Sequence, residues 1–340
     1  MTNPAPLLTG LVVVAAVGFD FVNGFHDAAN SIATIVATRV LKPTQAVLWA
    51  SSFTFAALFL FGTGVAKTVG SGMIALETVT PFVILAGLGG AIVWGIITWF
   101  LGLPTSSSHA LLGGYAGAAM TNNVLRHGWG AAFDSVIVSG WSRTILFIVL
   151  APMLGLLLAQ LFMKLTIAVF PKGHKTRNDR WFGWMQLFSS AFLSLMHGSN
   201  DAQKTAGIIA GALVAGGFSD HFMIPGWVLW LSYGTMAFGT LAGGWRIVHT
   251  MGRRLTRLNP ASGFCAETAA ALSIMLATIL QLPVSTTHTT TGAIVGVGAA
   301  RRISAVRWSI VGHIAWAWVF TIPAAAAIGA LFMTAAILVS

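Results

Sequence analysis

The sequence predicts an all-α integral membrane protein, on the basis of its composition, its long apolar runs and an internal duplication. Of its 340 residues, 56% are hydrophobic and only 8% are Asp, Glu, Lys or Arg. A soluble domain carries about 25% charged residues, so this chain lacks the charge to cover a surface in water. The 38 glycines and 13 tryptophans fit membrane helices that pack closely and place Trp at the interface. This composition excludes an ordinary globular enzyme, a nucleic-acid-binding domain and a disordered protein.

Long apolar runs define the predicted spanning helices. We expect them at 7–37, 44–66, 81–102, 141–170, 183–215, 225–248, 262–281 and 308–338. Alternation of period two is not sustained, which favours helices over a β-barrel. Two further segments, 103–121 and 283–300, are rich in small residues and open with Leu-Pro and a hydroxyl cluster. We expect these to be re-entrant or broken hairpins, giving about 10–12 membrane segments in all.

Two motifs occur twice in the same order, which indicates an internal repeat. Residues 24–28 (Gly-Phe-His-Asp-Ala) match 198–202 (Gly-Ser-Asn-Asp-Ala). Residues 103–109 (Leu-Pro-Thr-Ser-Ser-Ser-His) match 282–288 (Leu-Pro-Val-Ser-Thr-Thr-His). The sequence therefore predicts a first repeat at 1–170, a short polar cytoplasmic linker at 171–182 and a second repeat at 183–340.

The basic residues predict opposite orientations for the two repeats. If the linker is cytoplasmic, counting spans places Arg39, Lys42 and the basic groups within 246–257 and 301–307 on the same side. Both termini are then expected to be periplasmic. The loop after the first Asp motif lies inside, whereas its counterpart around Asp220 lies outside. Inverted repeats with interrupted helices are typical of secondary transporters, whose substrate site lies near the midplane between the repeats.

Asp27 and Asp201 lie at equivalent positions inside apolar helices. A charged side chain at membrane depth costs about 2.5–3.5 kcal/mol on the insertion scale, so such residues tend to face an ion or substrate path. Amide side chains flank both aspartates: Asn23, Asn30, Asn200 and Gln203. Carboxylate and amide oxygens suit a hard cation or a proton site, and a structural ion pair is the alternative.

The hydroxyl clusters follow a proline in each repeat. They comprise Thr105, Ser106 and Ser107 in the first repeat and Ser285, Thr286 and Thr287 in the second. A helix N-terminus carries free N–H donors and positive partial charge, so it binds anions without a formal charge. We expect the two clusters to hold a tetrahedral oxyanion between them, with ordinary N-capping as the alternative.

Three histidines and a lysine accompany these motifs. His109 and His288 end the hydroxyl clusters, and we expect them to support the site from behind rather than to relay protons. His197 precedes Asp201 by one helical turn and can orient its carboxylate. Lys204 stands where Asn30 stands in the first repeat, as a counter-charge for Asp201 or for an anionic substrate. The histidines lack the spacing of zinc ligands, so we expect neither a resident metal nor a cofactor. Glu267 ranks lower as a site residue because it lacks a repeat partner.

At these residues the sequence resembles the inorganic phosphate transporter (PiT) family. The motifs are 23–30 (Asn-Gly-Phe-His-Asp-Ala-Ala-Asn), 197–204 (His-Gly-Ser-Asn-Asp-Ala-Gln-Lys) and the two Leu-Pro hydroxyl-His segments. The resemblance implies a homodimer with two re-entrant hairpins that takes up inorganic phosphate with a coupling cation by an elevator-like movement. It also implies that hairpin hydroxyls and amides hold phosphate while the motif Asp and Asn residues hold the cation.

Two departures from the sodium-coupled members shape the expected function. His26 and Lys204 replace neutral residues with a titratable or positive group, as in bacterial low-affinity members, some of which carry a metal–phosphate complex. We therefore expect a proton-coupled phosphate permease of a bacterial inner membrane. The alternatives are a sodium-coupled phosphate or sulfate permease, a channel, and a membrane-embedded lipid phosphatase with a histidine nucleophile.

Overall fold

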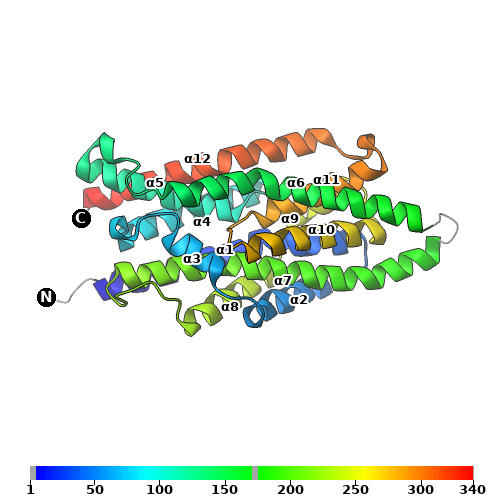
Figure 1. Cartoon of the computed structure of the whole chain (residues 1–340), viewed down its shortest axis with the longest axis horizontal. Coiled ribbons are helices and arrows are strands. Elements are labelled where there is room, and N and C mark those ends of the chain that lie inside the picture. Colours follow the sequence, from blue (N-terminus) through cyan, green and yellow to red (C-terminus); the bar gives the residue numbers. More distant parts are fainter. Residues whose placement is uncertain (1–4, 171–174, 340) are drawn as a thin grey trace.

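The computed structural model describes residues 5–170 and 175–339 and confirms the all-α prediction. These residues form twelve α-helices joined by short helical turns and loops, and no β-strand. The long helices run along the long axis of the molecule (Figure 1). Five of the described helices are long and apolar enough to cross a membrane, and a bent helix pair would make a sixth.

The helices divide between the two halves of the chain. The first half contains α1 (Ala5–Ala37), α2 (Pro43–Ala56), α3 (Gly64–Ser71), α4 (Pro81–Leu101), α5 (Ser107–His127) and α6 (Val138–Val169). The second half contains α7 (Lys175–Ala215), α8 (Gly226–Ala242), α9 (Trp245–His249), α10 (Pro260–Ile279), α11 (Thr286–Arg301) and α12 (Trp308–Val339).

Three boundaries differ from the sequence-based expectation. The helix expected at 44–66 breaks after Phe59, and the chain turns by 85° into α3. Gly62 and Gly64 lie at this turn. The helix expected at 225–248 ends at Ala242, where Gly243 adopts a φ of +66°, and continues as α9 and the π-helical turn η5 (Thr250–Arg254). Within the expected linker 171–182, residues 171–174 lie outside the described residues and α7 already begins at Lys175.

The chain breaks at both predicted hairpins, between α4 and α5 and between α10 and α11. Each break contains a residue with left-handed backbone, Gly102 at φ +65° and Gln281 at φ +60°. Each following helix is N-capped by a serine of the hydroxyl cluster: Ser106 accepts from the His109 N–H and Ser285 from the His288 N–H, both at 3.1 Å. The repeat predicted from the sequence is therefore repeated in local backbone geometry.

The two halves interlock through their hairpin helices. The last helix of the first half, α6, packs against α11, and the last helix of the second half, α12, packs against α5. Glycines make these contacts close: a Cβ added to Gly117 would lie 2.2 Å from the Ala326 carbonyl oxygen, and one added to Gly296 would lie 2.4 Å from that of Leu156. Small residues at matching positions thus let backbones meet directly, as in other membrane helices.

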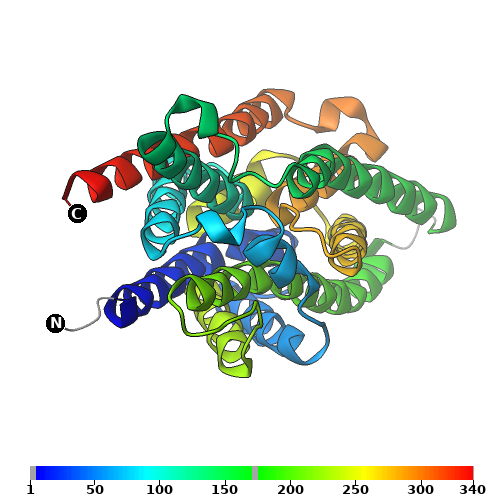
Figure 2. The same cartoon turned by 60° about the vertical axis from the view of Figure 1, so that its left-hand side comes forward.

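The ends of the molecule are distinct. Figure 1 and Figure 2 place the start of α1 and the end of α12 at one end, and the end of α6 with the start of α7 at the other. From the middle of the molecule, α5 runs toward the first of these ends and α11 toward the second (Figure 1). The two hairpin helices therefore point in opposite directions, as inverted repeats require.

Candidate functional site

Lys204 joins the second Asp motif to the tips of both hairpins. Its Nζ donates to Asp201 Oδ1 and to the Ser108 hydroxyl at the start of α5. It also donates to the Val284 carbonyl oxygen, at 2.8 Å, in the break before α11. One cation on α7 therefore contacts the carboxylate of its own helix and polar atoms of the two hairpins.

Asp201 has two further partners that lie on different helices. His197 Nε2 lies 3.0 Å from Asp201 Oδ2, one turn earlier on α7. The Thr286 hydroxyl donates to the same oxygen at 2.8 Å from the first residue of α11. His197, which we expect to orient Asp201, and Thr286, which we expect to hold the anion, thus contact the same carboxylate oxygen.

Asp27 is placed in the same way by the first motif. His26 Nδ1 lies 2.8 Å from Asp27 Oδ1, and the Thr287 hydroxyl donates to that oxygen at 3.2 Å. Asn30, one turn further along α1, donates to the hydroxyls of Thr286 and Thr287 at 3.2 and 3.0 Å. The start of α11 is therefore held by residues from both Asp motifs.

This cluster is closed to solvent. Asp27, Asp201 and Lys204 are each exposed by 2% or less. Burying two carboxylates and a lysine costs free energy unless each charge has partners, and the contacts above supply them. The structure is thus one in which the charged groups are shielded from both ends of the molecule.

Three buried amide oxygens of the two Asp motifs have no donor among the described residues. Asn30 and Asn200 use their amide nitrogens, the latter donating to Thr278 Oγ1 and the Leu282 carbonyl oxygen, both at 3.1 Å. Within the described residues, the side-chain oxygens of Asn23, Asn30 and Asn200 have no hydrogen-bond donor. An acceptor left empty in a buried site is costly, so these oxygens are suited to receive a cation or water.

Three atoms that can bind a cation come together in the two Asp motifs. One atom each of Asp27, His197 and Asp201 lies within 4.8 Å of the other two. Two carboxylate oxygens and an imidazole nitrogen can hold a cation, and they can equally share a proton. The predicted cation or proton residues of the two repeats therefore lie in one place, although they are 174 positions apart along the chain.

Other predicted site residues have different contacts. Ser106 and Ser285 use their hydroxyls as N-caps, and Ser107 is buried in the first turn of α5. Thr105 donates to Thr98 Oγ1 at 2.9 Å and lies 3.5 Å from His26 Nε2.

Gln203 points away from the Asp201 cluster. Its carbonyl oxygen accepts from the N–H groups of Val65 and Ala66, at 3.0 and 3.3 Å, in the first turn of α3. Its amide nitrogen donates to the Ser199 carbonyl oxygen at 2.7 Å. Gln203 thus fixes the bend between α2 and α3.

His109 and His288 form an aromatic group behind the hairpin tips. Their ring centroids lie 4.6 Å apart, and His288 stacks on Trp318 of α12 at 3.9 Å. Trp318 Nε1 donates to the Pro104 carbonyl oxygen at 2.9 Å. The two histidines thus link both hairpins to α12 without touching either motif aspartate.

Two buried carboxylates were outside the predicted site. Glu267 of α10 is fully buried and accepts from Thr34 Oγ1 and Ser189 Oγ, both at 2.5 Å, and from Gln186 Nε2 at 2.9 Å. Asp20 of α1 accepts from Thr205 Oγ1 at 2.8 Å. Both stand in apolar stretches of the sequence, and that signal alone would have marked them.

Comparisons with known proteins agree on one family. A model of the phosphate transporter family matches residues 23–178 and again 170–329. A Rhizobium meliloti (strain 1021) protein named a probable low-affinity inorganic phosphate transporter is 52% identical over 98% of each chain. A Bacillus subtilis (strain 168) protein of the same name is 38% identical over 96% of each. A solved structure titled "The sodium-dependent phosphate transporter" shares the fold, with a TM-score of 0.86 over 98% of this chain and all of that one, at 23% identity. The chain therefore belongs to the phosphate transporter family, whose members are membrane transporters and not enzymes.

Proposed function

We propose that this chain carries inorganic phosphate across a bacterial inner membrane by proton-coupled alternating access. The names of the Rhizobium and Bacillus relatives support phosphate as the substrate. The observation that carries the mechanism is Lys204, which contacts Asp201, Ser108 of one hairpin and Val284 of the other.

Competition for Lys204 can couple the proton to phosphate. While Asp201 is ionised, its carboxylate holds the ammonium group. A proton taken up by Asp201, with His197 beside it as the relay, cancels that charge and frees Lys204 for an anion. Phosphate then gains the lysine and the N–H donors at the starts of α5 and α11, so each ligand favours binding of the other.

The first motif supplies the second half of the same site. Asp27 is joined through Thr287 to the start of α11 and through His26 to Thr105 and Thr98 in the first hairpin. A change of charge at His26 or Asp27 therefore acts on both hairpins. The closed cluster supports an occluded stage of the cycle, with a homodimer as the assembly that the family resemblance predicts.

Sodium coupling is the second candidate, and the empty amide oxygens favour it. The oxygens of Asn23, Asn30 and Asn200 lack donors within the described residues, and an amide oxygen binds a metal cation but does not take a proton at neutral pH. Asp27, His197 and Asp201 would complete such a site.

Radiolabelled phosphate uptake into proteoliposomes tests the substrate assignment. We expect accumulation under an imposed ion gradient that excess unlabelled phosphate suppresses and excess sulfate leaves unchanged. Suppression by excess sulfate as well would show that the site does not distinguish the two anions, and no phosphate uptake under any gradient would overturn the proposal.

A further inference from the structure

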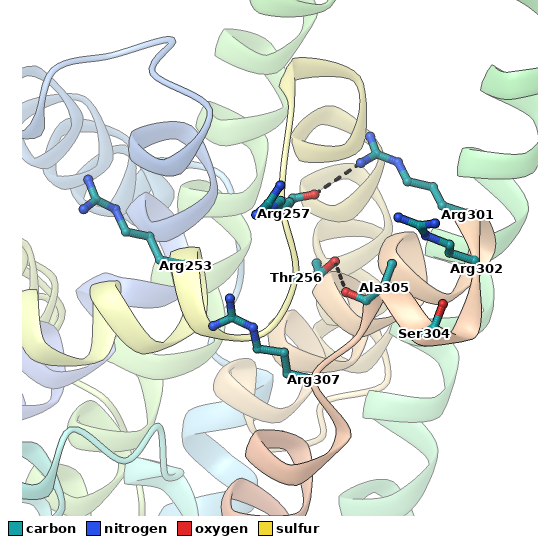
Figure 3. Close-up of a pocket in the computed structure, with 8 residues that line it drawn as sticks. All are labelled: Arg253, Thr256, Arg257, Arg301, Arg302, Ser304, Ala305 and Arg307. Carbon is teal, nitrogen blue, oxygen red and sulfur yellow. Dashed lines mark hydrogen bonds between the residues drawn. The ribbon is translucent and has the colours of Figure 1, made fainter.

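A pocket lined by arginines lies outside the transport site, where α11 ends and α12 begins. Its cavity measures about 500 Å³ and is lined by Arg253, Arg257, Arg301, Arg302 and Arg307 (Figure 3). These residues come from η5, the loop before α10, the end of α11 and the turn before α12. Four parts of the second half therefore contribute charge to one cavity.

The charges of this pocket are not balanced by the protein. The lining contains five arginines and no acidic residue. Every ion pair in the described part of the chain involves Asp27 or Asp201, which lie in the transport site. The positive-inside rule explains basic residues at this end of the molecule, but not their convergence on one cavity. Gathering like charges is unfavourable unless an anion joins them.

The arrangement leaves donor groups available. Arg301 is anchored by its bonds to the Arg257 carbonyl oxygen, at 3.2 Å, and to Asn259 Oδ1, at 2.6 Å. Figure 3 shows Arg301 and Arg302 near each other, with Arg301 reaching toward Arg257, whereas the guanidinium groups of Arg253 and Arg307 point away from them. Arg257 and Arg302 are exposed, and their guanidinium groups make no hydrogen bond among the described residues.

We propose that this pocket binds an anion that carries two or more phosphoryl groups. Guanidinium groups form paired, charge-assisted hydrogen bonds with phosphate oxygens, which lysine cannot match. Inorganic phosphate carries at most about two charges at neutral pH, too few to balance the pocket, whereas linked phosphoryl groups supply more charge in one molecule. Two sources have this chemistry: a soluble polyphosphate or nucleotide, and a diphosphate lipid headgroup, since the neighbouring Trp308 is half exposed.

An occupied pocket would act on transport through α11. This helix begins at Thr286, which contacts Asp201, and ends at Arg301 in the pocket. A bound anion would tie the end of α11 to the loop before α10 and to the start of α12. We therefore expect the anion to slow phosphate uptake when it is present on the side of the membrane that the arginine pocket faces. This consequence rests on the proposed function.

Calorimetric titration of the purified full chain tests the binding itself and does not depend on transport. The probes are tripolyphosphate, orthophosphate and sulfate in detergent, and tripolyphosphate again in nanodiscs with and without cardiolipin. The test variant is Arg257→Gln/Arg302→Gln. The control, Arg143→Gln/Arg254→Gln, removes the same charge: Arg143 lies near the start of α6, and Arg254 lines a different cavity.

We expect tripolyphosphate to bind about tenfold more tightly than orthophosphate, and about tenfold more weakly to the test variant than to the control. If cardiolipin in the nanodisc weakens tripolyphosphate binding, and does not do so in the test variant, the natural ligand is the lipid headgroup. If cardiolipin has no effect on tripolyphosphate binding, the natural ligand is the soluble anion. Equal affinities for tripolyphosphate and orthophosphate, or equal losses in the two variants, would overturn the proposal. The link to transport is tested by phosphate uptake into proteoliposomes with tripolyphosphate on the side of the arginine pocket. Equal inhibition of the test variant and the control would overturn this link, while the binding result would stand.

Discussion

At the scale of single residues, the account depends on the two motif aspartates. We predict that Asp27→Asn and Asp201→Asn each abolish gradient-driven phosphate uptake, because neither amide can take up and release a proton. Each amide keeps the size of the carboxyl group, so size-exclusion profiles should show both variants folded; Asp201→Asn should unfold at a lower temperature, because Lys204 loses its charge partner and keeps only Ser108 and Val284. Normal uptake rates with normal pH dependence in both variants would rule out the coupling assignment.

The Lys204–Asp201 pair gives a second prediction, which concerns stability. Lys204→Gln leaves a buried carboxylate without its cation and should lower the free energy of unfolding by about 3–5 kcal/mol. Adding Asp201→Asn removes that charge as well, so the double variant should regain most of this loss. Denaturant unfolding in detergent measures the cycle, and strict additivity of the two single effects would show that the pair is not coupled.

The sequence predicted which residues are candidates for the site, but not the contacts that they make. Duplication identified Asp27, Asp201 and the hydroxyl clusters, because two equivalent polar positions in apolar helices stand out. It gave no sign that Lys204 reaches Ser108 and Val284, since those bonds join residues 80 or more positions apart. The sequence also gave no sign of the contacts of Glu267: its three donors come from α1 and α7, and the sequence does not show which helices are neighbours.

At the scale of elements, close glycine contacts hold the hairpins. We predict that Gly296→Ala lowers the free energy of unfolding by about 1–3 kcal/mol, because the new Cβ would meet the Leu156 carbonyl oxygen of α6 at 2.4 Å. Gly18→Ala is the matched control: its Cβ meets nothing within 4 Å, and alanine favours a helix interior by about 1 kcal/mol. Equal effects of the two substitutions on thermal unfolding would contradict the packing argument.

Helix positions were predictable to within a few residues, and so were the breaks at the two hairpins, but the breaks after α2 and after α8 were not. Apolar length located α1, α4 and α6 because a membrane helix must be long and apolar. The turn between α2 and α3 escaped prediction, since its glycines stand in an apolar run that continues beyond them. The helix that packs against each hairpin helix could not be predicted either, because a membrane helix is apolar both on the face toward lipid and on the face toward protein.

At the scale of the whole molecule, orientation follows from charge. We predict that the end of the molecule with the arginine pocket is cytoplasmic and that the start of α6 is periplasmic. Cells that carry Ser142→Cys should react with an impermeant thiol reagent, whereas cells that carry Ser304→Cys should react only after lysis. Both sites are exposed, while the native Cys265 is buried. Labelling of Ser304→Cys in intact cells would reverse the topology.

The coupling ion is the central claim, and one measurement decides it. Proteoliposomes containing the protein are given either an inward proton gradient without sodium or an inward sodium gradient at equal pH, and phosphate uptake is followed. The account predicts accumulation under the proton gradient alone, through the Asp201–His197–Lys204 group. Accumulation that requires sodium would contradict it and would assign Asp27, Asp201 and the empty amide oxygens to a sodium site.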